Sequence, residues 1–184
     1  MTNLRIRVFP SAKTFINVED KIYKIAQSIE AVLLAKGWSV AAAESCTGGR
    51  IAAALTAVPG SSACFKGGVV AYAEEVKVRL LGVLPKTLNE EGVESELTVV
   101  EMARGVMQSM NTDFAVATTG VAGPSGGTEK IPVGTIWVAA ISHNEMRTYC
   151  IRHFDRGREE NTRNAVLVAL EVLREIVKKE EFQS

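Results

Sequence analysis

A serine and a lysine are the first residues of this sequence whose types and positions could support a reaction. Ser45 follows an apolar stretch and precedes an Ala-rich one, and Lys77 follows the apolar run Gly67 to Tyr72. A lysine can take a proton from a serine hydroxyl if burial or nearby positive charge lowers its pKa from about 10.4 toward 7 to 8. The alternative is that Ser45 or Thr47 merely caps a helix and that Lys77 is solvated at the surface.

The segment Glu44-Ser45-Cys46-Thr47-Gly48-Gly49 could also bind an anion. It precedes a predicted helix, where free backbone N–H groups and the helix dipole favour a phosphate or a developing oxyanion. We therefore predict that Cys46, Thr47, Gly48 and Gly49 bind substrate. Cys46 is also a rival nucleophile, because a thiol at a helix N-terminus can have a depressed pKa.

A glycine-rich segment, Thr119 to Gly127, follows another predicted strand. It contains neither the dinucleotide pattern G-x-G-x-x-G nor the P-loop ending G-K-[ST]. Its glycines allow a backbone nest that binds an anion, and a flexible turn between strands is the alternative. The segment therefore adds a third candidate loop without defining a ligand.

Composition excludes several classes of function. The chain has 184 residues, 47% of them hydrophobic, and its 21 basic and 21 acidic side chains give a net charge of +0. This balance provides no basic field for nucleic acid or an anionic membrane, and the longest uncharged runs are too short to cross a bilayer. The sequence has only two histidines, and its three cysteines form no CxxC pair. This composition argues against a zinc site, a Ser-His-Asp triad and a disulfide framework. We expect reduced thiols, a cytoplasmic location and no metal or cofactor.

Hydrophobic periodicity indicates the elements that must position these loops. We predict helices over residues 20–35 and 49–57, through Lys77 and Leu81, from near Ser95 to Met110, and on Val166, Leu170, Leu173 and Val177. Predicted strands are 38–43, 67–72 and 114–118, followed by a hairpin of 134–141 and 146–153. The alternation predicts an α/β fold, a three-layer α/β/α sandwich with a mixed β-sheet, over residues 18–184. Residues 1–17 are predicted to be a leader or a short edge strand. The candidate loops follow strands, and open α/β sheets bind ligands at that edge.

Four motifs together resemble the CinA C-terminal domain family. They are AESCTGGRIAAALTAVPGSS, GGVVAYAEEVKVRLLGV, VATTGVAGPSGG with PVGTIWVA, and HFDRGRE, and the resemblance extends from about Ile22 to the C-terminal helix. Members of this family include bacterial nicotinamide mononucleotide deamidases of the PncC type. The resemblance implies hydrolysis of nicotinamide mononucleotide to nicotinic acid mononucleotide and ammonia, in the recycling of pyridine nucleotides for NAD. It also implies a homo-oligomer.

The resemblance assigns roles to residues at matching positions. It implies that Ser45 is the nucleophile, that Lys77 is its base and that Tyr72 lies close to both. In the TG-x-AGP motif it implies that Thr119, Gly120 and Gly123 contact substrate. Arg158 is implied to bind the substrate phosphate, which suits a guanidinium fork.

Two positions depart from the family pattern. Glu74 stands where many members have Asn, and we expect a close Lys77–Glu74 pair to keep the ammonium charged and to raise its pKa. Gly157 stands where the family usually has Asp, which would leave Arg158 less firmly held. Both departures favour the alternative function, a nucleotide-binding or regulatory domain that has kept the fold and lost the reaction.

Overall fold

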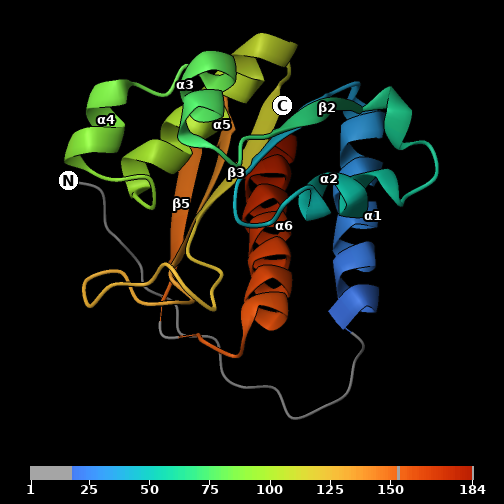
Figure 1. Cartoon of the computed structure of the whole chain (residues 1–184). Helices are drawn as coiled ribbons and strands as arrows, with labels where there is room; N and C mark the ends of the chain where they lie inside the picture. The colour runs from blue at the N-terminus through green and yellow to red at the C-terminus, as the bar shows by residue number, and fades with distance from the viewer. Residues whose placement is uncertain (1–17, 153, 184) are drawn as a thin grey trace.

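The computed structural model describes residues 18–152 and 154–183 of the chain (Figure 1). Residues 1–17, predicted as a leader or edge strand, and His153 lie outside the described residues. The elements, in chain order, are α1 (Val18–Lys36), β1 (Val40–Glu44), α2 (Arg50–Thr56), the 3-10 helix η1 (Ser61–Ala63), β2 (Phe65–Val70), α3 (Glu74–Leu81), α4 (Pro85–Glu90), α5 (Glu96–Met110), β3 (Phe114–Gly120), β4 (Ile136–Ser142), β5 (Met146–Ile151) and α6 (Arg158–Gln183).

The strands of the described chain form one mixed sheet in the order β2-β1-β3-β4-β5. β1 pairs in parallel with β2 and β3, and β4 and β5 continue the sheet as an antiparallel hairpin. Parallel strands need crossover connections. Elements α2 and η1 connect β1 to its neighbour β2, and α3 to α5 connect β2 to β3 on the other side of β1. The carboxyl ends of β1, β2 and β3 therefore meet at one edge of the sheet.

Helices cover both faces of the sheet, with α1, α2 and α6 on one side and α3 and α5 on the other (Figure 1). Successive side chains of β1 point to opposite faces of the sheet and so pack in two different cores. Val40 and Ala42 belong to the cluster under α1 and α6, while Ala41 and Ala43 belong to the cluster under α5. A strand that is buried on both faces explains the uninterrupted apolar run in the sequence. The predicted three-layer α/β/α sandwich with a mixed sheet is confirmed.

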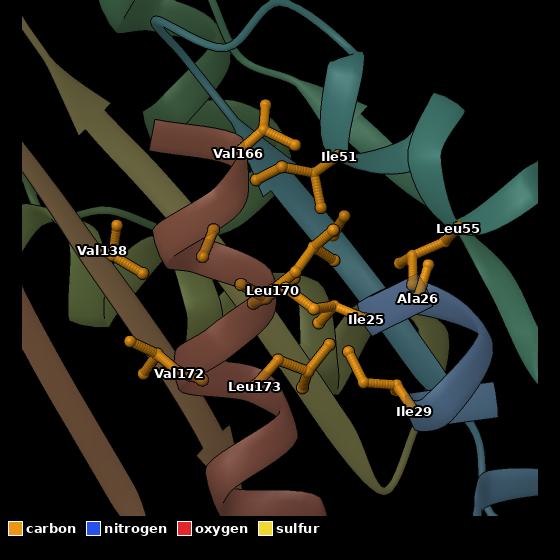
Figure 2. Close-up of a cluster of buried hydrophobic side chains, with 14 of the residues drawn as sticks. Ile25, Ala26, Ile29, Ile51, Leu55, Val138, Val166, Leu170, Val172 and Leu173 are labelled. Atoms are coloured by element: carbon orange, nitrogen blue, oxygen red, sulfur yellow. The ribbon is translucent and has the colours of Figure 1, made fainter. Parts of the chain in front are cut away.

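The larger core lies between α1, α2, α6 and the sheet. Figure 2 shows Ile25 and Ile29 of α1 near Leu170 and Leu173 of α6, with Val138 of β4 on the other side of α6 in this view. Each such side chain contributes roughly 1.5 to 3 kcal/mol when fully buried. The helical periodicity predicted for α1 and α6 thus marks their inward faces. Within residues 18–152 and 154–183, no helix combines the length and apolar character that crossing a membrane requires.

Two short elements were not predicted from the sequence. Helix α4 is six residues long and begins at Pro85, and η1 spans three residues. Neither is long enough to produce a repeating apolar face, so periodicity cannot reveal them. The predicted start of α5 is confirmed, because the Ser95 hydroxyl accepts a hydrogen bond from the Thr98 N–H and caps the helix.

Candidate active site

A pocket of about 220 Å³ lies at the sheet edge where β1, β2 and β3 end. Ser45 directly follows β1, Tyr72 follows β2, and Gly120 ends β3. Helices α3 and α6 contribute side chains from their first turns. The residues that line the pocket are Ser45, Cys46, Tyr72, Glu74, Lys77, Val93, Glu94, Gly120, Ala122 and Arg158.

Ser45 and Lys77 meet in this pocket. The Lys77 Nζ lies 3.0 Å from the Ser45 Oγ and donates a second hydrogen bond, of 2.7 Å, to the Ala71 carbonyl. Lys77 is only 1% exposed and Ser45 is 9% exposed. Burial lowers the pKa of the Lys77 amine, and the negative charge of Glu94 opposes that shift. A neutral Lys77 could accept the serine proton while the Ala71 carbonyl holds its Nζ in place.

Close helix packing places Lys77. The amine is carried by α3, which packs against α5 where Gly105 faces Leu81. A Cβ atom on Gly105 would lie 1.8 Å from the Leu81 carbonyl oxygen, so any larger residue would push the two helices apart. Because Lys77 and Leu81 share the short helix α3, a shift of that helix would move the amine away from Ser45.

The turn after β1 is organised by Glu44, whose carboxylate is 1% exposed. Its oxygens accept the backbone N–H groups of Gly49 at 3.0 Å, Ile51 at 3.1 Å and Ala52 at 2.8 Å. The side chain therefore occupies the N-terminus of α2 that the sequence suggested for a substrate anion.

The amides available to a substrate are fewer than predicted. The Gly49 N–H is bound by Glu44, and the Gly48 N–H donates to the Ser45 carbonyl at 3.1 Å. Within residues 18–152 and 154–183, no oxygen accepts from the N–H groups of Cys46 and Thr47. Of these two residues only Cys46 lines the pocket, because Thr47 is fully buried, so the predicted oxyanion site narrows to the Cys46 amide.

Cys46 does not have the low pKa that the sequence suggested. Burial, with a smaller contribution from the Glu44 carboxylate, raises the pKa of its thiol to about 12. The side chain is 6% exposed and belongs to the core cluster that includes Ile51. The thiolate needed for attack is therefore disfavoured, which argues against Cys46 as the rival nucleophile.

Two threonines predicted near substrate face away from the pocket. The Thr47 and Thr118 hydroxyls are bonded to each other at 2.7 Å, and Thr119 donates at 2.9 Å to the Val93 carbonyl. Thr118 and Thr119 are adjacent in β3, so their side chains lie on opposite faces of the sheet. Thr47 and Thr119 are fully buried and hold the loops around the pocket, while Gly120 lines it directly.

Arg158 links two of the predicted site residues. Its Nη1 donates to the Gly123 carbonyl and its Nη2 donates to the Tyr72 hydroxyl, both at 2.7 Å. Tyr72 is 62% exposed and lines the pocket, but its hydroxyl is bonded to Arg158 and not to Ser45 or Lys77. The side chain of Arg158 is fixed even though Gly157 precedes it.

The structure adds residues that sequence analysis did not assign to the site. Val93 and Glu94 come from the loop before α5, and Ala122 comes from the loop after β3. No motif marks Val93 or Glu94, because their position depends on how the segment after α4 returns to the sheet. Glu74 also lines the pocket, but the described structure contains no ion pair between it and Lys77. Glu74 raises the pKa of Lys77 as expected, yet burial has the larger effect and the net shift is downward.

The described residues contain no group of three or more His, Cys, Asp and Glu side chains arranged to hold a metal ion. The chemistry available in the pocket is that of a serine hydroxyl, a buried amine, two carboxylates and a guanidinium. Together with the Cys46 amide, these groups suit nucleophilic attack on a carbonyl followed by stabilisation of an oxyanion.

Comparison with known families gives a match to the CinA C-terminal domain over residues 22–177. A CinA-like protein of Shewanella denitrificans is 45% identical over 150 residues, which cover 82% of this chain and 35% of that protein. A Shewanella oneidensis protein named nicotinamide-nucleotide amidohydrolase PncC is 43% identical over 161 residues, covering 88% of this chain and 38% of that protein. The chain thus spans little more than a third of the length of these two relatives.

Solved structures agree with this match. The competence/damage inducible protein CihA of Agrobacterium tumefaciens superposes with a TM-score of 0.81 at 38% identity, covering 91% of this chain and 97% of that one. A CinA superfamily protein of Klebsiella pneumoniae also superposes with a TM-score of 0.81, at 35% identity, over 86% of this chain and 98% of that one.

Proposed function

This chain belongs to the CinA C-terminal domain family, and we propose that it hydrolyses the carboxamide of nicotinamide mononucleotide through Ser45 and Lys77. The products are nicotinic acid mononucleotide and ammonia. The observation that carries the proposal is the 3.0 Å contact between the Lys77 Nζ and the Ser45 Oγ, two side chains that are both buried. The name of the Shewanella oneidensis relative supports the choice of substrate.

The first half of the reaction forms an acyl-enzyme. Neutral Lys77 removes the Ser45 proton as the Oγ attacks the carboxamide carbon. The carbonyl oxygen becomes an oxyanion, which the N–H group of Cys46 stabilises. Lys77 then gives its proton to the nitrogen of the leaving group, so the C–N bond breaks, ammonia departs, and an ester to Ser45 remains.

The second half releases the acid. Lys77 is neutral again and takes a proton from a water molecule as the water oxygen attacks the ester carbon. Collapse of the second tetrahedral intermediate breaks the bond to Ser45, and Lys77 returns the proton to the Oγ. The hydrogen bond from Lys77 to the Ala71 carbonyl keeps the Nζ within reach of both oxygens during the two steps.

Arg158 is the group proposed to bind the substrate phosphate. It is exposed at the rim of the pocket, and its contacts with Gly123 and Tyr72 hold the guanidinium in one orientation. A preorganised guanidinium forms charge-assisted hydrogen bonds to phosphate oxygens with little further loss of side-chain entropy. The same proposal includes a homo-oligomer that acts in the cytoplasm in pyridine nucleotide recycling.

Ammonia release from nicotinamide mononucleotide tests the reaction. We expect Ser45→Ala to remove nearly all activity, because the attacking oxygen is gone, while Ser109→Ala, at an exposed position of α5, serves as the matched control. A calorimetric titration of the same compound is run in parallel. Full activity of Ser45→Ala would reject the nucleophile, and binding by the wild-type protein without ammonia release would favour the regulatory alternative.

A further inference from the structure

Two carboxylates line the pocket beside the Ser45–Lys77 pair. Glu74 is the first residue of α3, and Glu94 lies in the loop just before the N-cap of α5. Within residues 18–152 and 154–183, neither side chain forms an ion pair or a hydrogen bond. The guanidinium that lines the same pocket, Arg158, is bonded to Gly123 and Tyr72 instead. Both carboxylates are therefore available to a ligand.

The charged groups that line the pocket differ in exposure, because Glu94 is half-buried whereas Glu74 and Arg158 are exposed. Lys77 is buried, and the negative charges of Glu94 and Glu74 both act on its amine. Arg158 stands at the entrance on α6. When Lys77 is neutral, the charges that remain around the pocket are the carboxylates of Glu74 and Glu94 and the guanidinium of Arg158. A ligand with a cationic group near its amide and an anionic group at its far end fits this arrangement.

We infer that Glu74 and Glu94 select substrates in which the carboxamide is attached to a cationic, N-substituted ring. The inference rests on the proposed function and specifies its substrate class. In an N-substituted pyridinium the positive charge belongs to the same small ring as the carboxamide, so an amide placed at Ser45 brings that charge into the region of the two carboxylates. An uncharged aromatic amide of the same shape would leave both carboxylates without a partner.

The same arrangement couples selection to activation of the base. In the empty pocket Glu94 and Glu74 favour the charged form of Lys77, which cannot accept a proton. A cationic ring beside the amine offsets their effect and favours the neutral form. The right substrate thus assists the step that deprotonates Ser45, whereas an uncharged amide does not.

Nicotinamide mononucleotide and its reduced dihydropyridine form are a matched pair of probes. They share the carboxamide, ribose and phosphate, and differ in whether the ring carries a positive charge. Binding is measured by calorimetry in the Ser45→Ala background, which prevents turnover. We expect the oxidised form to bind about 10-fold more tightly than the reduced form, which corresponds to about 1.4 kcal/mol.

Variants locate the source of this preference. Glu94→Gln should remove most of it, and Glu74→Gln should remove less, because Glu74 is the more exposed of the two. The control is Glu75→Gln, which removes a neighbouring exposed carboxylate that does not line the pocket and should leave the preference unchanged. Circular dichroism confirms that each variant is folded. A structural role alone would weaken both ligands equally.

The outcomes separate this inference from the proposed function. Equal binding of the two ring forms, or a preference that survives Glu74→Gln and Glu94→Gln together, would overturn the selection even if the wild-type protein releases ammonia. A preference that the two variants abolish would support the selection even if the wild-type protein releases none. Absence of binding by both forms would overturn both.

Discussion

Two buried glutamates in different parts of the molecule show opposite ways of burying a charge. Glu44, at the end of β1, and Glu30, in the middle of α1, are both 1% exposed. Glu44 accepts three backbone N–H groups, whereas neither carboxyl oxygen of Glu30 has a hydrogen-bond partner in the described part of the chain. Burial raises the pKa of Glu30 to about 7. The two carboxyl groups therefore differ in the number of their hydrogen-bond partners, although they are equally buried.

Lys77 belongs with Glu44 in this comparison. It is equally buried, and the Ser45 Oγ and the Ala71 carbonyl satisfy its amine. Removing a buried group that has partners leaves those partners unsatisfied, which costs free energy, whereas neutralising a group without partners removes a cost. Substitution of Glu44 or Lys77 should therefore be costly. A neutral side chain in place of Glu30 should instead increase the stability of the protein at high pH.

The largest effect is expected for Lys77→Ala on activity. The variant lacks the base, so kcat/KM for ammonia release from nicotinamide mononucleotide should fall about 10³-fold. The control is Lys86→Ala, at an exposed lysine of α4. A variant that keeps wild-type activity would exclude Lys77 as the base.

The next effect is a loss of stability in Glu44→Ala. The substitution removes an ionised acceptor from three backbone N–H groups, each such bond contributing about 1.5 kcal/mol, so the free energy of unfolding should decrease by roughly 4 kcal/mol. Urea unfolding with an unchanged m-value measures it. Glu44→Gln should recover part of the loss because its amide oxygen still accepts. An unaltered midpoint in Glu44→Ala would show that the carboxylate does not stabilise the turn.

Glu30 should destabilise the folded protein as the pH rises, whereas Glu44 stabilises it. Because its pKa is about 7 in the folded protein and 4.5 when unperturbed, the folded state retains a proton that the unfolded state has lost between these values. Stability therefore falls as pH rises from about 4.5 to 7, by about 3 kcal/mol, and changes no further above that range. Glu30→Gln cannot ionise, so its stability relative to wild type should rise by this amount over the same interval. Urea unfolding at pH 5 and pH 8 measures the difference, and parallel pH profiles would contradict it.

The smallest effect is expected at the Thr47–Thr118 pair. Thr47→Val leaves the buried Thr118 hydroxyl without its 2.7 Å partner and should cost about 1 to 2 kcal/mol. The double variant with Thr118→Val should lose less than the sum of the two single losses, since it leaves no unpaired hydroxyl. Additive losses in thermal or urea unfolding would show that the two hydroxyls do not depend on each other.

Much of the fold follows from local patterns. The apolar positions of α1 and α6 recur with the helical period, and the uninterrupted apolar runs of β1 and β3 are typical of strands covered on both faces. The short helix α4 lacks such a pattern. The opposite orientations of Thr118 and Thr119 could have been predicted from strand alternation, but their partners, Thr47 and Val93, depend on how distant segments pack around β3.

The sequence by itself determined which reactive side chains the protein carries and which secondary structure elements carry them. Ser45 follows a strand, Lys77 belongs to a short helix, and the four motifs already resembled the family to which the chain belongs. These are local properties, because periodicity and loop composition involve residues close together in the chain.

Only the tertiary structure decided the environment of those side chains. The 3.0 Å contact of Lys77 with Ser45, the burial that lowers the pKa of Lys77 and raises that of Cys46, and the presence of Glu94 in the pocket all depend on segments distant in sequence. A pKa responds to desolvation and to charges within a few ångströms, and both are set by how the elements pack.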